Sequence, residues 1–217
     1  MIKGIDVSHW NGEINFNQVK AAGVEFVIIK AGGSDRGFYT DSKFITNYNR
    51  AVAAGLSVGA YYFAGKKFRG IESGVLDARR FIKILDGLKF DYPVFIDIEA
   101  QENRYKEEIT DAAVAFCEEM EKAGYFVGIY ASDISGFKDK LNHERIESYY
   151  VYWVARYGKE PEICKNYGLW QYSSKGRIPG IIGSVDLDIS AVDYSKVIKE
   201  KGFNGYTAKK KTKKKEA

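Results

Sequence analysis

The chain has 217 residues, enough for one sizeable hydrophobic core, and its 45% hydrophobic and 29% charged residues exclude a disordered or fibrous protein. The formal net charge is +4, but residues 209–217 hold six lysines and one glutamate, so the rest of the chain carries a net −1. A nearly neutral body lacks the distributed positive face of a nucleic-acid binder. The longest uncharged apolar stretches, 56–65 and 148–155, are too short for the roughly 18 residues of a membrane span.

The elements repeat one local pattern along the chain. A helical stretch ends in small residues and a glycine, at Gly23, Gly55 and Gly124, and an apolar run follows at once. Glycine readily adopts the left-handed conformation just past a helix, and a short loop then leads into a strand. The pattern predicts helix-to-strand units used repeatedly.

The predicted elements alternate regularly in the first half of the chain. We predict helices over 41–54, 72–85 and 110–123, the last with Thr110 as its N-cap. The predicted strands cover residues 3–8, 24–31, 56–63, 93–99, 125–131, 149–156, 168–172 and 184–189. Helix-length spacers separate the first five strands, whereas loops or short helices connect the others. This favours a small α/β barrel with an incomplete outer ring of helices.

An open doubly wound sheet is the alternative fold, but the nucleotide-binding signatures that accompany it are missing. Gly32 and Gly33 follow the second strand without a third glycine at the right spacing, and the chain holds no P-loop motif. Two cysteines, Cys117 and Cys164, are expected to be buried thiols, and two histidines are too few for a histidine-based metal site. We therefore expect no cofactor and no metal.

The run 94–99 carries the clearest chemical signal. Strand side chains alternate, so Ile96 and Ile98 share one face while Asp97 and Glu99 share the other. If the isoleucines pack against the helices, both carboxylates point into the mouth of the barrel. Glycoside hydrolysis needs such a pair, one acid as proton donor and one carboxylate beside the sugar carbon. The alternative is a pair of edge-strand charges in salt bridges.

The same alternation places further acids on the inner face of the first and last strands. Asp6 alternates with apolar neighbours near the start, as Asp186 and Asp188 do near the end. In a closed barrel these two strands are neighbours, so the acids are expected to converge. A turn or cap carboxylate is the alternative role for Asp6. A carboxylate cluster could also bind Mg²⁺ or Ca²⁺, but no calcium-loop or phosphate-recognition motif accompanies it.

Aromatic residues make up 15% of the chain and collect near predicted strand ends. An aromatic ring offers a flat apolar face to a pyranose, although any single ring serves more often in packing. As a set around acids they are typical of a sugar-binding groove. They are Tyr61, Tyr62, Tyr130, Trp153, Tyr157, Trp170 and Tyr172.

These motifs together resemble the glycoside hydrolase family 25 lysozymes. The resemblance lies in Gly-Ile-Asp-Val-Ser-His-Trp-Asn-Gly at 4–12, Asp-Ile-Glu at 97–99, Trp-Gln-Tyr at 170–172 and Val-Asp-Leu-Asp at 185–188, in the family's order over residues 2–198. It implies a single irregular TIM-like (β/α)5(β)3 barrel, with a catalytic domain at 1–203. Residues 204–217 are then a lysine-rich, disordered tail or linker.

The resemblance also implies an activity and its residues. The expected reaction is cleavage of the β-1,4 bond between N-acetylmuramic acid and N-acetylglucosamine in bacterial cell-wall peptidoglycan, the expected partner, without membrane insertion or nucleic acid. By motif, Glu99 resembles the general acid, Asp97 its partner at the sugar carbon, and Asp6 and Asp186 supporting carboxylates. The positions that resemble substrate contacts are Tyr62, Tyr130, Trp153, Gln171 and Asp188.

Several alternatives stay open at this stage. Asp97 is expected to assist attack by the substrate's own 2-acetamido group, but a direct Asp97 nucleophile or an inverting route through water also fits. The substrate could be chitin or another acetamido glycan, or the barrel could bind wall glycan without cutting it. The first residues lack signal-peptide features, so we expect action on the wall after release from the cytoplasm, as for a phage endolysin, or secretion with the signal removed.

Overall fold

The protein, described here from a computed structural model over residues 1–146 and 150–208, is a closed barrel of eight strands. In space the strands follow the order β1, β9, β8, β7, β6, β5, β4, β2, and pairing of β1 with β2 closes the ring. The barrel strands are β1 (Ile2–Val7), β2 (Phe26–Gly33), β4 (Ser57–Phe63), β5 (Val94–Asp97), β6 (Val127–Ser132), β7 (Val151–Ala155), β8 (Leu169–Gly176) and β9 (Val185–Ser190). A two-residue strand, β3 (Tyr39–Thr40), pairs with the end of β2.

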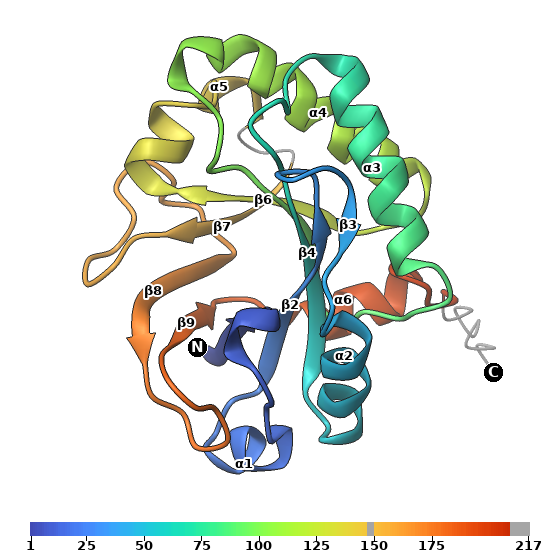
Figure 1. The fold of residues 1–217 in the computed structure, drawn as a ribbon, viewed down its shortest axis with the longest axis vertical. Coiled ribbons are helices and arrows are strands. Elements are labelled where there is room, and N and C mark those ends of the chain that lie inside the picture. Colours follow the sequence, from blue (N-terminus) through green and yellow to red (C-terminus); the bar gives the residue numbers. More distant parts are fainter. Residues whose placement is uncertain (147–149, 209–217) are drawn as a thin grey trace, which may run out of the picture.

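Helices cover only part of the barrel. The α-helices are α1 (Phe16–Ala21), α2 (Phe44–Ala53), α3 (Ile71–Leu85), α4 (Lys106–Lys122), α5 (His143–Ile146) and α6 (Tyr194–Lys201). Short 3-10 turns η1 (His9–Asn11) and η2 (Asn103–Tyr105) and a π-helical turn η3 (Asp133–Lys138) lie between them. Helix α2 packs on β2 and β4, and α4 on β5 and β6. In Figure 1, α2 and α3 lie on the right and the hairpin of β8 and β9 at the lower left.

The (β/α)5(β)3 architecture is confirmed. Neighbouring strands from β1 through β2, β4, β5, β6 and β7 to β8 run parallel, and only β9 runs antiparallel, to both β8 and β1. All eight predicted strands are present, although Tyr149, the predicted start of one, lies outside the described residues. No helix among the described residues is long and apolar enough to cross a membrane.

The predicted helix ends are partly confirmed. Gly23, Gly55 and Gly124 follow α1, α2 and α4 with φ of +88°, +75° and +85°, the left-handed region in which glycine is favoured. The N-cap prediction for Thr110 is wrong, because α4 begins four residues earlier. The Thr110 hydroxyl instead donates to the carbonyl of Lys106 at 2.7 Å, as threonine does inside a helix.

Strand alternation divides the core into two layers. Outward side chains such as Ile5, Ile96 and Ile98 pack between barrel and helices. Inward side chains, among them Phe26, Phe95 and Trp153, fill the barrel interior. The filling is tight, since a Cβ added at Gly4 would lie 2.2 Å from the Phe26 ring. The packed interior leaves the mouth, at the carboxyl ends of the parallel strands, as the place for a site.

The chain continues to pack beyond the predicted domain end. Asn204 is fully buried, and its side-chain oxygen accepts a hydrogen bond from the Phe126 N–H at 2.7 Å. The Tyr206 hydroxyl donates to Asp91 at 2.7 Å. Asn204 therefore belongs to the packed barrel and not to a tail beginning at 204. The predicted disorder of 209–217 falls outside the described residues.

Candidate active site

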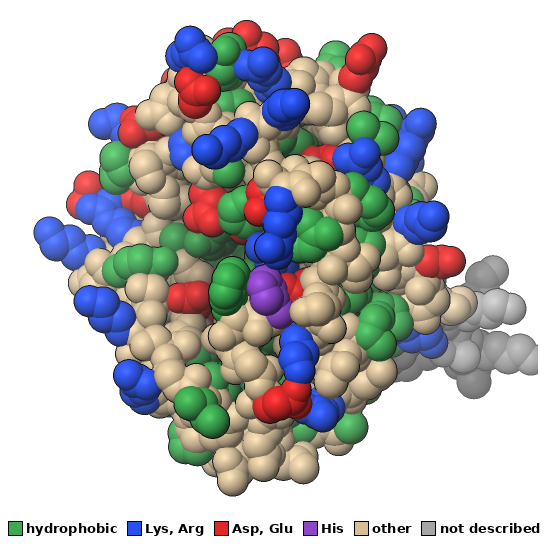
Figure 2. All heavy atoms as spheres, in the orientation of Figure 1, with side chains coloured by type: hydrophobic (Ala, Val, Ile, Leu, Met, Phe, Trp, Pro, Cys, Tyr) green, Lys and Arg blue, Asp and Glu red, His purple; other side chains and the backbone are tan. Residues whose placement is uncertain are grey.

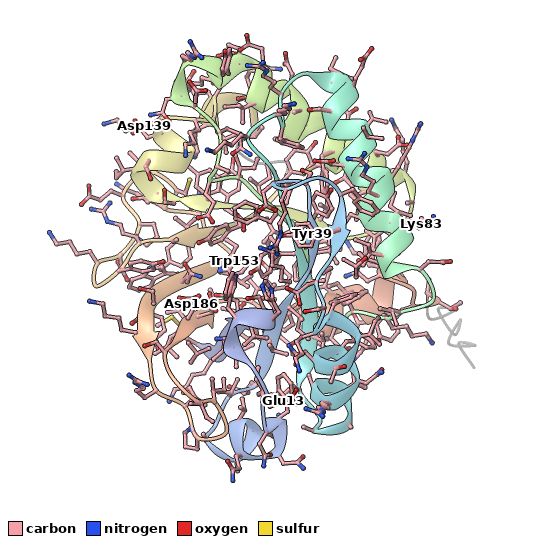
Figure 3. The ribbon with its side chains drawn as sticks, in the orientation of Figure 1. Glu13, Tyr39, Lys83, Asp139, Trp153 and Asp186 are labelled. Atoms are coloured by element: carbon pink, nitrogen blue, oxygen red, sulfur yellow. The ribbon has the colours of Figure 1, made fainter. Side chains whose placement is uncertain are left out.

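A cleft of about 470 Å³ opens at the mouth of the barrel. Figure 2 shows acidic and hydrophobic side chains next to each other around a hollow near the middle of this face. In Figure 3, Trp153 and Asp186 lie near the middle of the view, whereas Lys83 and Asp139 lie at the periphery. The cleft is lined by Asp6, Ser8, Trp10, Asn11, Lys30, Tyr61, Phe63, Asp97, Glu99, Tyr130, Trp153, Tyr157, Gln171, Ser174, Ser184, Val185 and Asp186.

Asp97 and Glu99 lie together in one wall of the cleft, as the alternation predicts. Asp97 ends β5 and is paired in register with Phe63 and Tyr130 on the neighbouring strands. Glu99 follows two residues later, and the Ile98 N–H donates to the Tyr130 carbonyl at 2.9 Å, which fixes the backbone between the two acids. Asp97 is only 4% exposed, whereas Glu99 is exposed to the cleft. The sequence prediction of an inward-facing pair is therefore confirmed in position.

Both carboxyl groups hold their protons more tightly than free ones. Burial is the main reason why the pKa of Asp97 lies well above its usual value, and the nearby charge of Glu99 raises it further. Partial burial in the cleft wall also raises the pKa of Glu99. One oxygen of Asp97 is buried without a hydrogen-bond partner among the described residues. The pair can therefore supply a proton at a pH where isolated carboxyl groups are ionised.

Two lysines act on this pair. Lys30 on β2 is 8% exposed, and its ammonium group lies 4.3 Å from the centroid of the Phe63 ring, next to Asp97 in the sheet. Lys140 donates to the backbone carbonyl of Glu99. Their positive charges lower the pKa of both Asp97 and Glu99, against the effect of burial. Lys30 was missed from sequence, although a lysine on the inner face of an apolar strand is a detectable signal.

Three further acids come from the first and last strands. Asp6 is paired in register with Asp186 across the antiparallel contact of β1 and β9, and Asp188 lies two residues farther along β9. Gln171 on β8 donates its amide to Asp6 at 2.7 Å, and the Trp153 indole donates to Asp188 at 2.7 Å. The predicted convergence of acids from the two strands is thus found.

Gln171 connects this cluster to the other wall of the cleft. Its side-chain oxygen accepts hydrogen bonds from the hydroxyls of Tyr130 at 2.9 Å and Tyr157 at 3.2 Å. These two bonds orient the amide so that its nitrogen faces Asp6. Tyr130, Trp153 and Gln171 therefore all belong to the cleft or its wall, where sequence placed them.

The charge of Asp188 acts on Asp6 and raises its pKa, in addition to the effect of burial. One carboxyl oxygen of Asp188 is buried without a hydrogen-bond partner among the described residues. Burial raises the pKa of Asp6 well above its usual value and that of Asp188 to about 8. Burial also raises the pKa of Asp186, and the charge of Glu99 adds to it. The acids of this cluster thus bind their protons more tightly than free carboxyl groups do.

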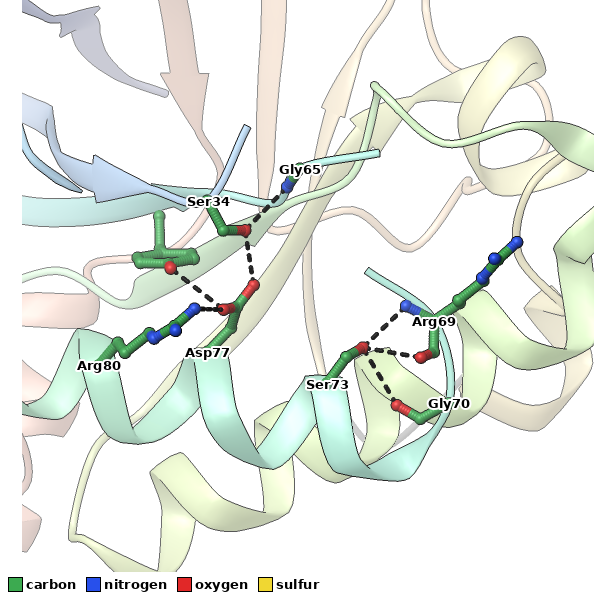
Figure 4. A network of polar contacts seen from close by, with 8 residues as sticks. Ser34, Gly65, Arg69, Gly70, Ser73, Asp77 and Arg80 are labelled. Atoms are coloured by element: carbon green, nitrogen blue, oxygen red, sulfur yellow. Dashed lines mark hydrogen bonds and ion pairs between the residues drawn. The ribbon is translucent and has the colours of Figure 1, made fainter. Parts of the chain in front are cut away.

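Two predicted site residues do not line the cleft, Tyr62 and Asp188, and Asp188 is only 1% exposed. Tyr62 lies farthest from the prediction. It is fully buried in the outer core, where its ring packs against Phe81 and Phe116 and its hydroxyl donates to Asp77 at 3.2 Å. Figure 4 shows Asp77 in the same network with Ser34 and Arg80. The preceding residue, Tyr61, lines the cleft instead. The prediction of a substrate contact at Tyr62 is wrong because the inner face of β4 carries the odd-numbered residues.

Known proteins resemble this chain in sequence and in fold. The profile of the glycosyl hydrolases family 25 matches residues 5–181, most of the barrel. The chain belongs to glycosyl hydrolase family 25. An autolytic lysozyme of Clostridium acetobutylicum is 33% identical over 188 residues, which cover 86% of this chain and 55% of that protein. The family 25 chain thus spans little more than half the length of this relative.

Solved structures agree with the family assignment. The CTP1L endolysin superposes with a TM-score of 0.79 at 29% identity, covering 93% of this chain and 70% of that one. A bacterial lysozyme from Streptomyces coelicolor superposes with a TM-score of 0.76 at 27% identity, covering 91% of this chain and 95% of that one. The structural likeness therefore covers more of the chain than the family match at residues 5–181 does.

Besides Lys30, several other residues that line the family 25 cleft were given no role from sequence. Tyr61 and Tyr157 were named only among the aromatic residues, and Trp10 only as part of the N-terminal motif. Among the described residues, no three His, Cys, Asp or Glu side chains gather as metal ligands do. Gln171 donates to Asp6 of the cleft, and the Trp153 indole donates to the buried Asp188 beside it.

Proposed function

We propose that this protein is a peptidoglycan hydrolase that cuts the β-1,4 bond between N-acetylmuramic acid and N-acetylglucosamine of the bacterial cell wall. The observation that carries the proposal is the pair of Asp97 and Glu99 in the cleft wall, with raised pKa values, facing a second acid cluster across the mouth. Family membership and the lysozyme relatives support this substrate class.

Glu99 is the proton donor in the proposed reaction. Its carboxyl group opens to the cleft, so it can reach a glycosidic oxygen, whereas Asp97 lies deeper. The substrate carries a 2-acetamido group beside the bond to be cut. When the acetamido N–H donates to Asp97, it stabilises the ionised form of that carboxyl, so the proton of the pair resides on Glu99.

Bond cleavage then follows with balanced proton transfer. Glu99 gives its proton to the departing oxygen while the acetamido oxygen attacks the anomeric carbon, forming a cyclic oxazolinium ion whose N–H faces the Asp97 carboxylate. Water next attacks the same carbon and gives its proton to Glu99, which reopens the ring and restores the acid. Two displacements leave the product in the original β configuration.

Asp6 and Asp186 support the charge and position of the substrate from the other wall. Gln171 is held by Tyr130 and Tyr157 and fixes Asp6 in turn. The proposed substrate-contacting residues are Tyr130, Gln171 and the face of Trp153 in the cleft, while Asp188 acts through its bond to Trp153.

The proposal is tested by identifying the new reducing sugar. Purified Gram-positive peptidoglycan is digested, the products are reduced with borohydride and the sugar alcohols are separated. The wild type is expected to release muramitol, and Glu99→Gln to release none. Glu102→Gln is the matched control, because Glu102 is an exposed acid that lies outside the cleft lining.

Each other result has a defined meaning. Glucosaminitol would show that the opposite bond is cut. No new reducing end from peptidoglycan, together with cleavage of chitin oligomers, would replace the substrate by another acetamido glycan. Binding to wall glycan without any cleavage would contradict the enzymatic proposal.

The stereochemistry tests the acetamido route separately. NMR of the first-formed anomer is expected to show β before mutarotation. A first-formed α anomer would contradict acetamido participation and indicate direct attack by water with inversion.

A further inference from the structure

Trp10 is an exposed aromatic side chain in the cleft whose position no feature of the fold explains. It is 80% exposed and lines the cleft. Among the described residues, the other strongly exposed large hydrophobic side chain of the cleft is Tyr157, whose hydroxyl is already bonded to Gln171. A large indole left in water beside a polar cleft marks a surface that is covered when a ligand is bound.

The backbone holds Trp10 rigidly. Ser8 and Asn11 form a capping box around η1, in which the Trp10 N–H donates to the Ser8 hydroxyl at 3.2 Å and the Ser8 N–H donates to the Asn11 side chain at 2.9 Å. The two bonds hold the backbone of residues 8–11 in one turn, so the indole of Trp10 projects from a fixed backbone.

Contacts on both sides of η1 add to this rigidity. The His9 ring nitrogen lies 2.6 Å from the buried carboxylate of Asp41, whose same oxygen accepts the His9 N–H at 3.2 Å. On the other side the Asn11 amide donates to the Ser184 carbonyl at 3.4 Å. The His9 ring lies 4.5 Å from the Trp10 ring. A preorganised ring loses little conformational entropy when a ligand stacks on it.

Trp10 lies away from the reacting pair. It follows β1, whereas Asp97 ends β5 and Glu99 follows it, and at least two strands, β2 and β4, separate β1 from β5 around the barrel. Asn11 and Ser184 lie beside Trp10 in the lining and offer polar groups. A flat apolar face with polar neighbours fits a pyranose ring, whose C–H face stacks while its hydroxyls form hydrogen bonds.

We propose that Trp10 is the stacking platform of an additional sugar-binding subsite, which holds a sugar of the glycan strand away from the bond being cut and makes the enzyme prefer long glycan strands. The inference rests on the proposed function, since it takes the same glycan as ligand. Trp10 then contributes to binding and not to bond cleavage.

The test compares glycan lengths in Trp10 variants. The substrates are a tetrasaccharide and an octasaccharide of alternating N-acetylglucosamine and N-acetylmuramic acid. Trp10→Ala is expected to raise KM for the octasaccharide by about 3- to 10-fold, with kcat nearly unchanged, and to affect the tetrasaccharide less. Trp10→Phe restores most of the loss, because a ring remains. Phe38→Ala, an exposed aromatic position outside the cleft lining, is the control.

A binding measurement separates this inference from the proposed reaction. Octasaccharide affinity is measured by calorimetry in Glu99→Gln and in Glu99→Gln/Trp10→Ala, so that no turnover is needed. A 3- to 10-fold weaker affinity of the double variant supports the subsite. Equal affinities, or a Trp10→Ala effect on kcat alone or equal for both lengths, would overturn it. Failure of the wild type to cleave either substrate would contradict the proposed function and leave the binding comparison decisive for Trp10.

Discussion

Lys30 is a buried cation beside two buried carboxyl groups, and removing its charge has a predictable sign. Its charge lowers the pKa of Asp97 and Glu99. In Lys30→Met both pKa values rise, so both limbs of the pH profile of kcat/KM move to higher pH. On the acidic side, where Asp97 must ionise, kcat/KM is expected to fall by roughly tenfold.

Two variants control for this experiment. Lys30→Arg keeps the charge and is expected to keep the position of the profile, while Lys83→Met removes a charge from an exposed site on α3. A Lys30→Met profile unmoved along the pH axis, with a uniform loss of rate, would mean that Lys30 acts by packing and not by its charge.

Asp188 makes stability depend on pH in the opposite sense from an ordinary salt-bridged acid. Its pKa is about 8 in the folded protein against 3.8 for a free group, so the folded state holds the additional proton between these values. Stability is therefore expected to fall as pH rises through this window. Asp188→Asn keeps an acceptor for the Trp153 indole and removes the ionisation.

Thermal unfolding across this pH range is the measurement. Asp188→Asn is expected to flatten the fall and to raise Tm at the alkaline end by about 2–4 °C, which corresponds to ~1 kcal/mol in a chain of this size. Asp86→Asn, an exposed aspartate after α3, makes the same chemical change without burial. A lower Tm of Asp188→Asn at high pH would show that the carboxylate itself stabilises the fold.

At residue scale, the sequence predicts the acids better than the aromatic residues. Asp6, Asp97 and Asp186 alternate with apolar residues, so their inward orientation follows from the strand period. Neither Tyr61 nor Tyr62 has a charged neighbour that marks the inner face of β4. The phase of β4 relative to β2 also shifts at a bulge between Lys30 and Gly32, which a period of two does not reveal.

At element scale, α3 and α4 pack at a contact that requires glycine. Gly74 of α3 lies so close to α4 that an added Cβ would be 2.2 Å from the carbonyl oxygen of Ala112. Alanine is favoured over glycine inside a helix by ~1 kcal/mol, yet a backbone oxygen cannot move aside without separating the helices. We therefore expect Gly74→Ala to destabilise the protein, by ~1–3 kcal/mol net.

Urea unfolding tests the helix contact. Lys83→Ala, an exposed position of the same helix, is the control and is expected to change stability by less than ~0.5 kcal/mol. An increase in stability for Gly74→Ala comparable with the helix-propensity gain would mean that the two helices can separate at little cost.

Element boundaries were the weaker part of the sequence prediction for a physical reason. Thr110 has the side chain of an N-cap, but the same hydroxyl is equally satisfied inside a helix by the carbonyl four residues back. Glu107 and Glu108 at the observed first turn favour an earlier start, because acidic side chains interact well with the positive helix end. An N-cap and acidic residues in the first turn each contribute only about 1 kcal/mol, so these local preferences alone do not decide where α4 begins.

At the scale of the whole molecule, the repeated helix-to-strand units favoured a barrel over an open doubly wound sheet, and the family resemblance implied its (β/α)5(β)3 form. The connections from β7 to β8 and from β8 to β9 carry no helix, which leaves the outer ring incomplete. The reversed direction of β9 does not follow from strand periods. It results from the hairpin that joins β8 to β9, and it brings Asp186 beside Asp6 at the mouth. The pairing of β1 with β9 therefore both helps to close the barrel and brings the acids of the cleft together.

Asn204 closes the opposite end of the barrel, and its loss is expected to weaken the whole fold. Its amide nitrogen donates to the carbonyls of Phe90 at 3.3 Å and Tyr92 at 2.9 Å, while its oxygen accepts from Phe126. It thereby ties the segments that lead into β5 and β6. Its φ of +54° is a conformation that asparagine tolerates better than alanine.

Replacing Asn204 by alanine leaves three buried backbone groups without their partner and adds backbone strain. Asn204→Ala is expected to lower the free energy of unfolding by at least ~3 kcal/mol, measured by urea denaturation, against less than ~0.5 kcal/mol for the exposed Asn17→Ala. The cleft lies at the other end, so the folded fraction of Asn204→Ala should keep the wild-type KM. A stability loss as small as that of Asn17→Ala would show that Asn204 does not contribute to the fold, and would support a domain end at residue 203.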